Sequence, residues 1–209
     1  MKTINSFINE KLKITKNMIH SQQDYVDLGL PSGTLWATCN VGAKTETEYG
    51  DYFAWGEIDT KKEYTWETYK YGDENNIKKY TKEDKLEELE LDDDVAYTCG
   101  KDDWHIPTAE QFRELKEHTR YKWHNNYNDS GINGMLFTGE NGNTIFLPAG
   151  GLKHENVVRY SNTDGQYWSK KLYTDGCDSA VGFEFNSKYT TICTAYRCIG
   201  YSVRPVLNK

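Results

Sequence analysis

Residues 166–206 read QYWSKKLYTDGCDSAVGFEFNSKYTTICTAYRCIGYSVRPV. Residues 167–169, 181–185 and 201–206 alternate or cluster β-branched and aromatic side chains, which is typical of half-buried strands. Residues 189–199 instead mix small, polar and aromatic side chains without a period, so they lack the single apolar face that a core strand needs. Two interpretations stay open for that segment. It is either an irregular edge strand without function or an exposed contact surface, where Tyr supplies contact area at a low entropy cost.

The composition limits the classes of protein to consider. The chain has 209 residues, which is enough to bury a core without help from a metal or a disulfide. Its 16 Tyr and 6 Trp place many amphipathic rings near the surface. A net charge of −7, without a Lys/Arg cluster, argues against nucleic acid as a partner. Five Cys at uneven spacing do not match a disulfide framework.

The first residues are expected to form a segment distinct from the domain at 24–209. Apolar side chains recur there at helical spacing, at Ile4, Phe7, Ile8 and Leu12. Because so short a helix is not stable alone, we expect residues 1–20 to attach the domain to a particle or to sister copies, with 1–23 as helix and linker. The segment lacks the apolar core of a secretory signal, and no stretch reaches transmembrane length. We therefore expect synthesis in the cytoplasm and no membrane insertion.

The domain is expected to be α+β, with helices segregated from the sheets. The expected order is strands at 25–30 and 35–41, helices at 81–91 and 108–118, a hairpin at 134–146, and the later strands. Thr108 and Gln111 have the spacing of a capping box, and Asn141-Gly142 is a strong hairpin turn. Residues 61–80 are expected to be a surface excursion, and 152–165 a loop.

Few residues suggest catalysis or a cofactor. No phosphate-binding, dinucleotide, serine-nucleophile or zinc-protease motif occurs, and no cofactor is expected. Asp92–Asp94 could bind a hard cation, or form a solvated helix start favoured by the helix dipole. Cys193 and Cys198 are separated by four residues and could hold a soft metal such as copper(I) or act as a redox pair. They could equally belong to the mixed surface of 189–199.

Several motifs, in order, resemble those of one family. They are YVDLGLPSGTLWATCNVGA (25–43), YGDYFAWGE (49–57), WHIPTAEQFREL (104–115), IFLPAGG (145–151), YWS (167–169) and SVRPV (202–206). Together they make residues 25–207 similar to the Fibrobacter-type major paralogous domain and to the C-type-lectin-like variable proteins of diversity-generating retroelements, found in gut Bacteroidetes and their phages. FINEKLKI (7–14) resembles leader segments of Bacteroides phage proteins.

The resemblance implies a C-type-lectin-like fold, with two helices packed on short antiparallel sheets and long loops. The last strands of that fold would present a ligand-binding surface, with SVRPV as the fixed end of a diversified region. Residues 189–199 contain no Met, Trp, Gln, Glu or Lys, which adenine-directed diversification does not readily produce. Arg197 falls at a position that is usually fixed in the family. Lys188 and Glu184 depart from the pattern and are assigned to the scaffold.

The expected function is therefore binding rather than catalysis. The module would present residues 173–182 and 189–199 to a bacterial cell-surface protein or glycan, with a virion surface as one setting. Aromatic anchors would carry much of the binding energy, as they do at other interfaces. These anchors would be Tyr173, Tyr189, Tyr196 and Trp168. The expected ligand-binding residues are Trp168, Tyr173, Gly176, Cys177, Asp178, Gly182, Tyr189, Thr191, Cys193, Thr194, Ala195, Tyr196, Cys198 and Ile199.

Two other functions stay open. A copper oxidase of the formylglycine-generating type shares this superfamily and would use Cys193 and Cys198, which match the spacing of its copper site. Its Arg-Gly-Gly-Ser-type segment is replaced here by Phe185–Lys188. A structural virion decoration protein is the third possibility. The Glu-Pro-Asn, Gln-Pro-Asp and Trp-Asn-Asp signatures of calcium-dependent sugar binding do not occur.

Overall fold

The structure is a computed structural model that describes residues 25–99 and 103–208. The described residues form short antiparallel sheets and two α-helices, α2 (Val95–Cys99) and α3 (Ala109–Glu117). This confirms the α+β class expected from the sequence. The expected helix and linker at 1–23 lie outside the described residues.

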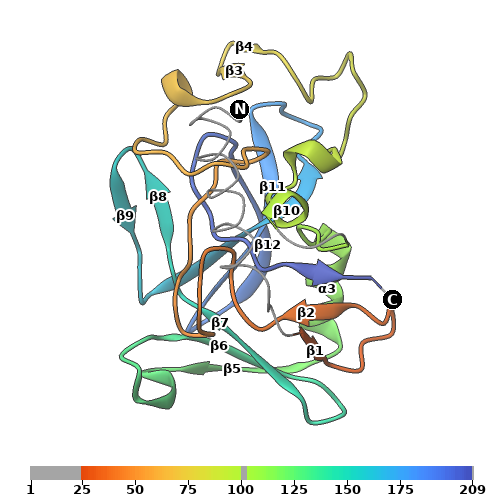
Figure 1. The fold of residues 1–209 in the computed structure, drawn as a ribbon, viewed down its shortest axis with the longest axis vertical. Coiled ribbons are helices and arrows are strands. Elements are labelled where there is room, and N and C mark those ends of the chain that lie inside the picture. The colour runs from red at the N-terminus through yellow and green to blue at the C-terminus, as the bar shows by residue number, and fades with distance from the viewer. Residues whose placement is uncertain (1–24, 100–102, 209) are drawn as a thin grey trace, which may run out of the picture.

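The longest strands form one antiparallel sheet in the middle of the molecule (Figure 1). Its order is β10 (Asp164–Leu172), β11 (Ser179–Asn186) and β12 (Thr190–Tyr196). The strands expected at 167–169 and 181–185 are confirmed within β10 and β11. The aperiodic segment 189–199 contains β12, which lies at the edge of this sheet with β11 as its partner. An edge strand packs only part of its length, which explains why no clear apolar period marks it in the sequence.

Smaller sheets surround this central one. The other three-stranded sheets are β5 (Arg120–His124), β6 (Gly134–Thr138) and β7 (Thr144–Pro148), and β1 (Tyr25–Asp27), β2 (Leu35–Ala37) and β13 (Val206–Leu207). The two-stranded sheets are β3 (Gly72–Asp73) with β4 (Asn76–Ile77), and β8 (Leu152–His154) with β9 (Val157–Arg159). Short 3-10 helices lie at Trp66–Thr68, Leu91–Asp93 and Tyr127–Asp129.

Two expected local features are confirmed. The chain turns between β6 and β7 at Asn141-Gly142, where Gly142 has a φ of 85° that residues with a side chain rarely adopt. Helix α3 begins after Thr108, whose hydroxyl accepts the Gln111 backbone N–H at 3.0 Å while the Gln111 side chain accepts the Thr108 N–H at 2.8 Å. Local hydrogen bonds of this kind depend only on near neighbours, so the sequence reveals them.

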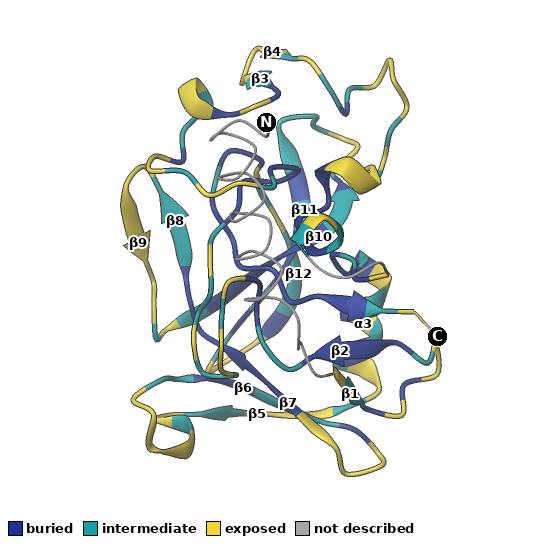
Figure 2. Ribbon diagram, in the orientation of Figure 1, coloured by how far each residue is buried: buried dark blue, intermediate teal, exposed yellow. Residues whose placement is uncertain are grey.

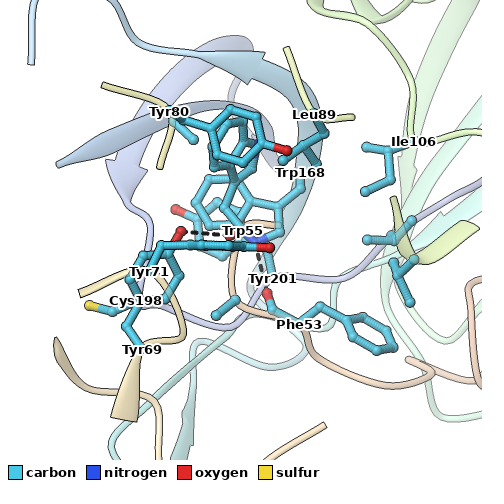
Figure 3. Packing of buried hydrophobic residues seen from close by; sticks show 14 of the residues in the cluster. Phe53, Trp55, Tyr69, Tyr71, Tyr80, Leu89, Ile106, Trp168, Cys198 and Tyr201 are labelled. Carbon is cyan, nitrogen blue, oxygen red and sulfur yellow. Dashed lines mark hydrogen bonds between the residues drawn. The ribbon is translucent and has the colours of Figure 1, made fainter. Parts of the chain in front are cut away.

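The central sheet lies between two apolar clusters. On one side, Phe183 of β11 stacks on Phe112 of α3 with ring centroids 4.8 Å apart. On the other side is an aromatic cluster that includes Phe53, Trp55, Tyr69, Tyr71, Tyr80, Trp168 and Tyr201 (Figure 3). Successive strand residues point to opposite faces, so β10 sends Tyr167 into the first cluster and Trp168 into the second.

The segment 61–80 is only in part the surface excursion expected from its polar sequence: residues 73–76 are exposed, but several tyrosines of the segment are buried. Tyr69, Tyr71 and Tyr80 are buried in the aromatic cluster. The Tyr69 hydroxyl donates to the Trp55 carbonyl at 2.7 Å, and the Tyr71 hydroxyl donates to the Asp93 carboxylate. A Tyr ring can be buried once its hydroxyl finds a partner, and those partners are not visible in the sequence.

The helix expected at 81–91 does not form. The Asp84 carboxylate accepts backbone N–H bonds from Thr81 and Leu86, and Lys85 takes a φ of 58°, outside the helical region. The following residues lie along the end of β10, where the Leu172 N–H donates to the Glu87 carbonyl at 2.8 Å. Local side-chain bonds and pairing with β10 therefore outweigh the helical spacing of the leucines.

Two other expectations need correction. Residues 152–165 are not a plain loop, because they contain the hairpin β8–β9. The strand expected at 201–206 is regular only at Val206, which belongs to β13. Tyr201 and Ser202 make isolated bridges to Phe53 and to Tyr167, so this segment connects the N-terminal part of the domain with β10.

Candidate ligand-binding surface

Strand β12 presents its side chains on two faces. Thr191, Cys193 and Ala195 pair with Glu184, Gly182 and Ala180 of β11. Paired residues point to the same face, which is the face of the aromatic cluster. Thr194 alternates with them and projects to the other side. The expected surface of 189–199 is therefore divided between two faces that meet at the sheet edge.

Several of the expected residues are accessible to solvent. Tyr189 and Tyr196 are 45% and 47% exposed, and Thr194 is also exposed. Figure 2 colours much of β12 as intermediate in burial. The partly buried members of the expected set are Tyr173, Gly176, Cys177, Asp178, Thr191, Cys193, Ala195 and Ile199. Tyr189 directly precedes β12 and Tyr196 is the last of its seven residues, so the two lie roughly 20 Å apart at the usual strand rise.

The loop at 173–178 lies beside two shallow hollows. One, of about 190 Å³, is lined by residues 81–82 and 85–87 together with Leu172, Thr174 and Cys177. The other, of about 400 Å³, lies between residues 74–75, Ile77, 81–83 and 176–178. Gly176, Cys177 and Asp178 thus belong to a concave part of the surface.

Arg197 connects this loop to β12. The residue is fully buried, and its guanidinium donates to the Tyr69 hydroxyl, the Lys79 carbonyl and the Cys177 carbonyl, each at 2.9 Å. Its backbone N–H donates to the Asp178 carbonyl at 3.0 Å. The fixed donor geometry of a guanidinium can hold several carbonyls at once. Arg197 therefore holds the end of β12, the loop at 173–178 and the segment before residue 80 in one arrangement.

Three of the expected ligand-binding residues are too buried to touch a ligand. Trp168 is 1% exposed, stacks on Tyr201 with centroids 4.2 Å apart and donates its indole N–H to the Phe53 carbonyl. Gly182 is buried because the Tyr201 ring packs on the sheet there, 3.2 Å from where a Cβ would lie. Cys198 is 3% exposed within the aromatic cluster. All three are packed beneath the exposed side chains and stabilise the strands that carry them.

The orientation of the Tyr189 ring is fixed by a hydrogen bond to the Glu184 carboxylate. Its hydroxyl donates to Glu184 Oε1 at 2.5 Å, and this hydrogen bond, with a smaller contribution from burial, raises the Tyr189 pKa to about 12. Glu184, assigned to the scaffold from the sequence, therefore belongs to the same surface. A bond from the hydroxyl fixes an exposed ring that would otherwise sample several rotamers.

The environment of the two thiols opposes metal binding. Burial raises the pKa of both Cys193 and Cys198 to about 12. Because the thiolate is the form that binds metals and reacts, neutral buried thiols are poor ligands and poor nucleophiles. Across the described residues, no group of three or more His, Cys, Asp or Glu side chains is placed to hold a metal ion.

The aspartates at 92–94 already have protein partners. Asp93 accepts hydrogen bonds from Lys70, Tyr71, Lys79 and Tyr80. Asp94 caps α2, since its Oδ1 accepts the Ala96 N–H at 2.9 Å, and it also binds the Ile106 N–H. Their oxygens are used to join segments, which is the structural alternative to a cation site.

The sequence did not identify two residues that border the surface. Trp66 packs edge-on against Tyr196 with ring centroids 6.0 Å apart. Lys82 lines both hollows beside the loop at 173–178. Both residues come from segments distant in sequence, and tertiary folding alone brings them to the surface. No local pattern could have marked them.

Comparisons of the chain with protein families, with curated proteins and with solved structures give no match. In the ranges 25–99 and 103–208, no helix is both long enough and apolar enough to cross a lipid bilayer. The chemistry and geometry of the surface itself are therefore the basis for a functional proposal.

Proposed function

We propose that this chain is a ligand-binding module with a C-type-lectin-like fold. It would present β12 and the loop at 173–178 to a bacterial cell-surface protein or glycan, as part of a phage virion or a phage-encoded adhesin. The sequence resemblance suggests this setting, and the α+β arrangement with two helices and short antiparallel sheets is compatible with it.

The observation that carries the proposal is the contrast between Arg197 and its neighbours. Arg197 is 0% exposed and holds three segments through hydrogen bonds, whereas Tyr196, directly before it, is 47% exposed. Thr194, two residues further back, is exposed as well. A rigid support beneath accessible side chains allows those side chains to vary without refolding, as in other recognition surfaces.

A triple substitution tests the binding role. Tyr189→Ala, Thr191→Ala and Tyr196→Ala together should reduce binding to intact host bacteria by at least about tenfold, since aromatic anchors carry most of the energy of an interface. The matched control combines Tyr121→Ala with Tyr160→Ala, because both rings are exposed but lie on other elements. Binding across a panel of Bacteroidetes strains, measured by flow cytometry, should fall only in the triple variant.

Unchanged binding by the folded triple variant would contradict the proposal. If particles bind normally but lose integrity, the structural decoration function would be favoured instead. The diversification suggested by the resemblance has a separate genomic test. It requires a near-identical repeat of the DNA encoding residues 188–206, differing at adenines and located beside a reverse transcriptase gene.

A further inference from the structure

A row of polar side chains crosses the central sheet at the end nearest Tyr189. Gln166 of β10 pairs with Glu184 of β11, which pairs with Thr191 of β12. Directly paired residues share a face, with Cβ atoms about 5 Å apart. We call the group formed by Gln166, Glu184, Tyr189 and Thr191 the acceptor corner.

Glu184 carries a charge without a cationic partner in the corner. Among the described residues, its carboxylate accepts one hydrogen bond, from the Tyr189 hydroxyl, and no Lys, Arg or His there forms an ion pair with it. Lys188 is exposed nearby, but its backbone N–H donates to Asn186 and its ammonium makes no ion pair with Glu184. Asp164, which pairs with Asn186 on the same face, adds a second negative charge.

Gln166 provides an independent observation. The residue is 5% exposed, yet its side-chain oxygen Oε1 has no hydrogen-bond partner. A buried acceptor left without a donor costs roughly 1–3 kcal/mol. Gln166 lies beside Glu184 on the same face of the sheet. Because Oε1 is itself buried, the Gln166 side chain has to rotate toward the carboxylate before a donor group bound there can satisfy this oxygen.

The Tyr189 ring completes the corner. It is 45% exposed and fixed by its bond to Glu184, so its face is available next to a carboxylate. Cations bind to such ring faces and gain more when a negative charge lies beside the ring. The Thr191 hydroxyl, which bonds to the neighbouring Ile192 carbonyl at 3.2 Å, adds a further oxygen to the row.

We propose that the acceptor corner binds a guanidinium group, and therefore that the ligand of this surface is a protein presenting an arginine side chain. The inference rests on the binding function proposed above and deepens it by choosing protein over glycan. A guanidinium offers five donors in a planar fork. It can bond to Glu184 while its plane stacks on Tyr189, and to Gln166 once that side chain rotates toward the carboxylate. The net charge of −7 favours approach of a basic partner.

The test uses a small probe in place of the unidentified ligand. Nα-acetyl-arginine methylamide is titrated into the full chain, with the citrulline analogue as a neutral probe of the same shape. We expect the arginine probe to shift the NMR signals of Thr191, Tyr189 and the Gln166 side-chain amide. It should bind at least about tenfold more tightly than the citrulline probe, the difference expected for a charge-assisted hydrogen bond.

Two variants distinguish binding at the acceptor corner from a general attraction to the negative charge of the chain. Glu184→Gln should reduce the affinity for the arginine probe at least about tenfold. Glu140→Gln removes the same charge from an exposed turn and should change nothing. Tyr189→Phe should bind the probe at least as well as the native chain, because the ring remains and the carboxylate is released. Matched melting temperatures show that the variants are folded.

Equal binding of the two probes, or equal loss in the Glu184 and Glu140 variants, overturns the inference. It is also overturned if the probe shifts signals only outside the corner. If the arginine probe fails while the triple variant described above still loses host binding, the guanidinium assignment is wrong and the binding function stands. If both tests fail, the surface is not a binding site.

Discussion

Arg197 shows how one residue links the fold to the surface. Its guanidinium lies against the Trp55 ring at 4.9 Å and against the Tyr80 ring at 5.6 Å, while its donors hold carbonyls from two other segments. A lysine could not reach all of these acceptors, since it has one nitrogen. The resemblance marks this position as usually fixed, and the hydrogen bonds give a physical reason for it.

The first prediction concerns the stability that Arg197 provides. Arg197→Ala should lower the free energy of unfolding by about 3–5 kcal/mol, because it leaves buried carbonyls without donors and creates a cavity. Arg197→Lys should have a smaller but clear effect. Urea denaturation measures both. Arg113→Ala is the control, since Arg113 is about half exposed and pairs with the exposed Glu110 on the same helix, and it should stay within about 0.5 kcal/mol. Similar losses for Arg113 and Arg197 would refute this role.

At the scale of elements, Asp93 fixes the segment 66–80 to the rest of the domain. Burial alone would raise the Asp93 pKa, but hydrogen bonds from Lys79, Tyr71 and Tyr80 outweigh it and hold the pKa at about 2. The carboxylate is therefore charged in the folded state at every physiological pH. Without these bonds the buried Tyr80 hydroxyl would lose the acceptor of its proton, and the Tyr71 hydroxyl would keep only the Gly56 carbonyl as a partner.

The second prediction follows from this lowered pKa. An unfolded Asp has a pKa near 3.9, so the folded state favours the charged form by about 2–3 kcal/mol. This contribution is complete above about pH 4 and is lost as the pH falls from about 4 to 2. Asp93→Asn should therefore destabilise the protein at pH 7, and its difference from the native protein should shrink in that acidic window. Chemical denaturation at several pH values measures the difference.

Asp92→Asn is the matched control for the Asp93 substitution. Asp92 is the exposed neighbour of Asp93 in the same 3-10 helix and should change stability by less than about 0.5 kcal/mol. A difference between native protein and the Asp93 variant that stays constant from pH 7 to pH 2 would show that the carboxylate contributes nothing through its charge.

The elements that the sequence predicted depend on local chemistry. The capping box at Thr108 and the Asn141-Gly142 turn are encoded within a few residues, and both form as expected. The helix expected at 81–91 failed because its decisive contacts are with β10, far along the chain. Strand β12 had no clear period because each of its faces packs over only part of its length. Propensity is overridden where long-range pairing decides the backbone.

At the scale of the whole molecule, the burial of each side chain depends on tertiary packing, and the sequence alone could not predict it. Loops and edges could be recognised by composition, but burial could not: Trp168 and Tyr189 are both aromatic, and one is 1% exposed whereas the other is 45% exposed. Trp168 is buried because Tyr201, which is distant in the sequence, stacks on its ring in the folded protein. The unpartnered Gln166 oxygen likewise exists only once three strands are assembled. These features depend on tertiary structure.

The last prediction concerns cooperativity. The two apolar clusters share the central sheet, since β10 sends alternate residues into each, so neither can lose its packing without exposing the other. Phe112→Ala on one side and Phe53→Ala on the other should each cost about 3–5 kcal/mol. Each variant should still unfold in one transition. Far-UV circular dichroism and Trp fluorescence should report coincident midpoints in both variants.

Separate unfolding transitions in the Phe112→Ala variant would contradict the predicted cooperativity, because the aromatic cluster would then unfold independently of α3. Tyr121→Ala serves as control, as its ring is 43% exposed and should have little effect on the midpoint. A single transition has a consequence for recognition. Strand β12 receives support on both faces of one cooperative unit, so exposed positions such as Thr194 can change while the backbone that presents them keeps its place.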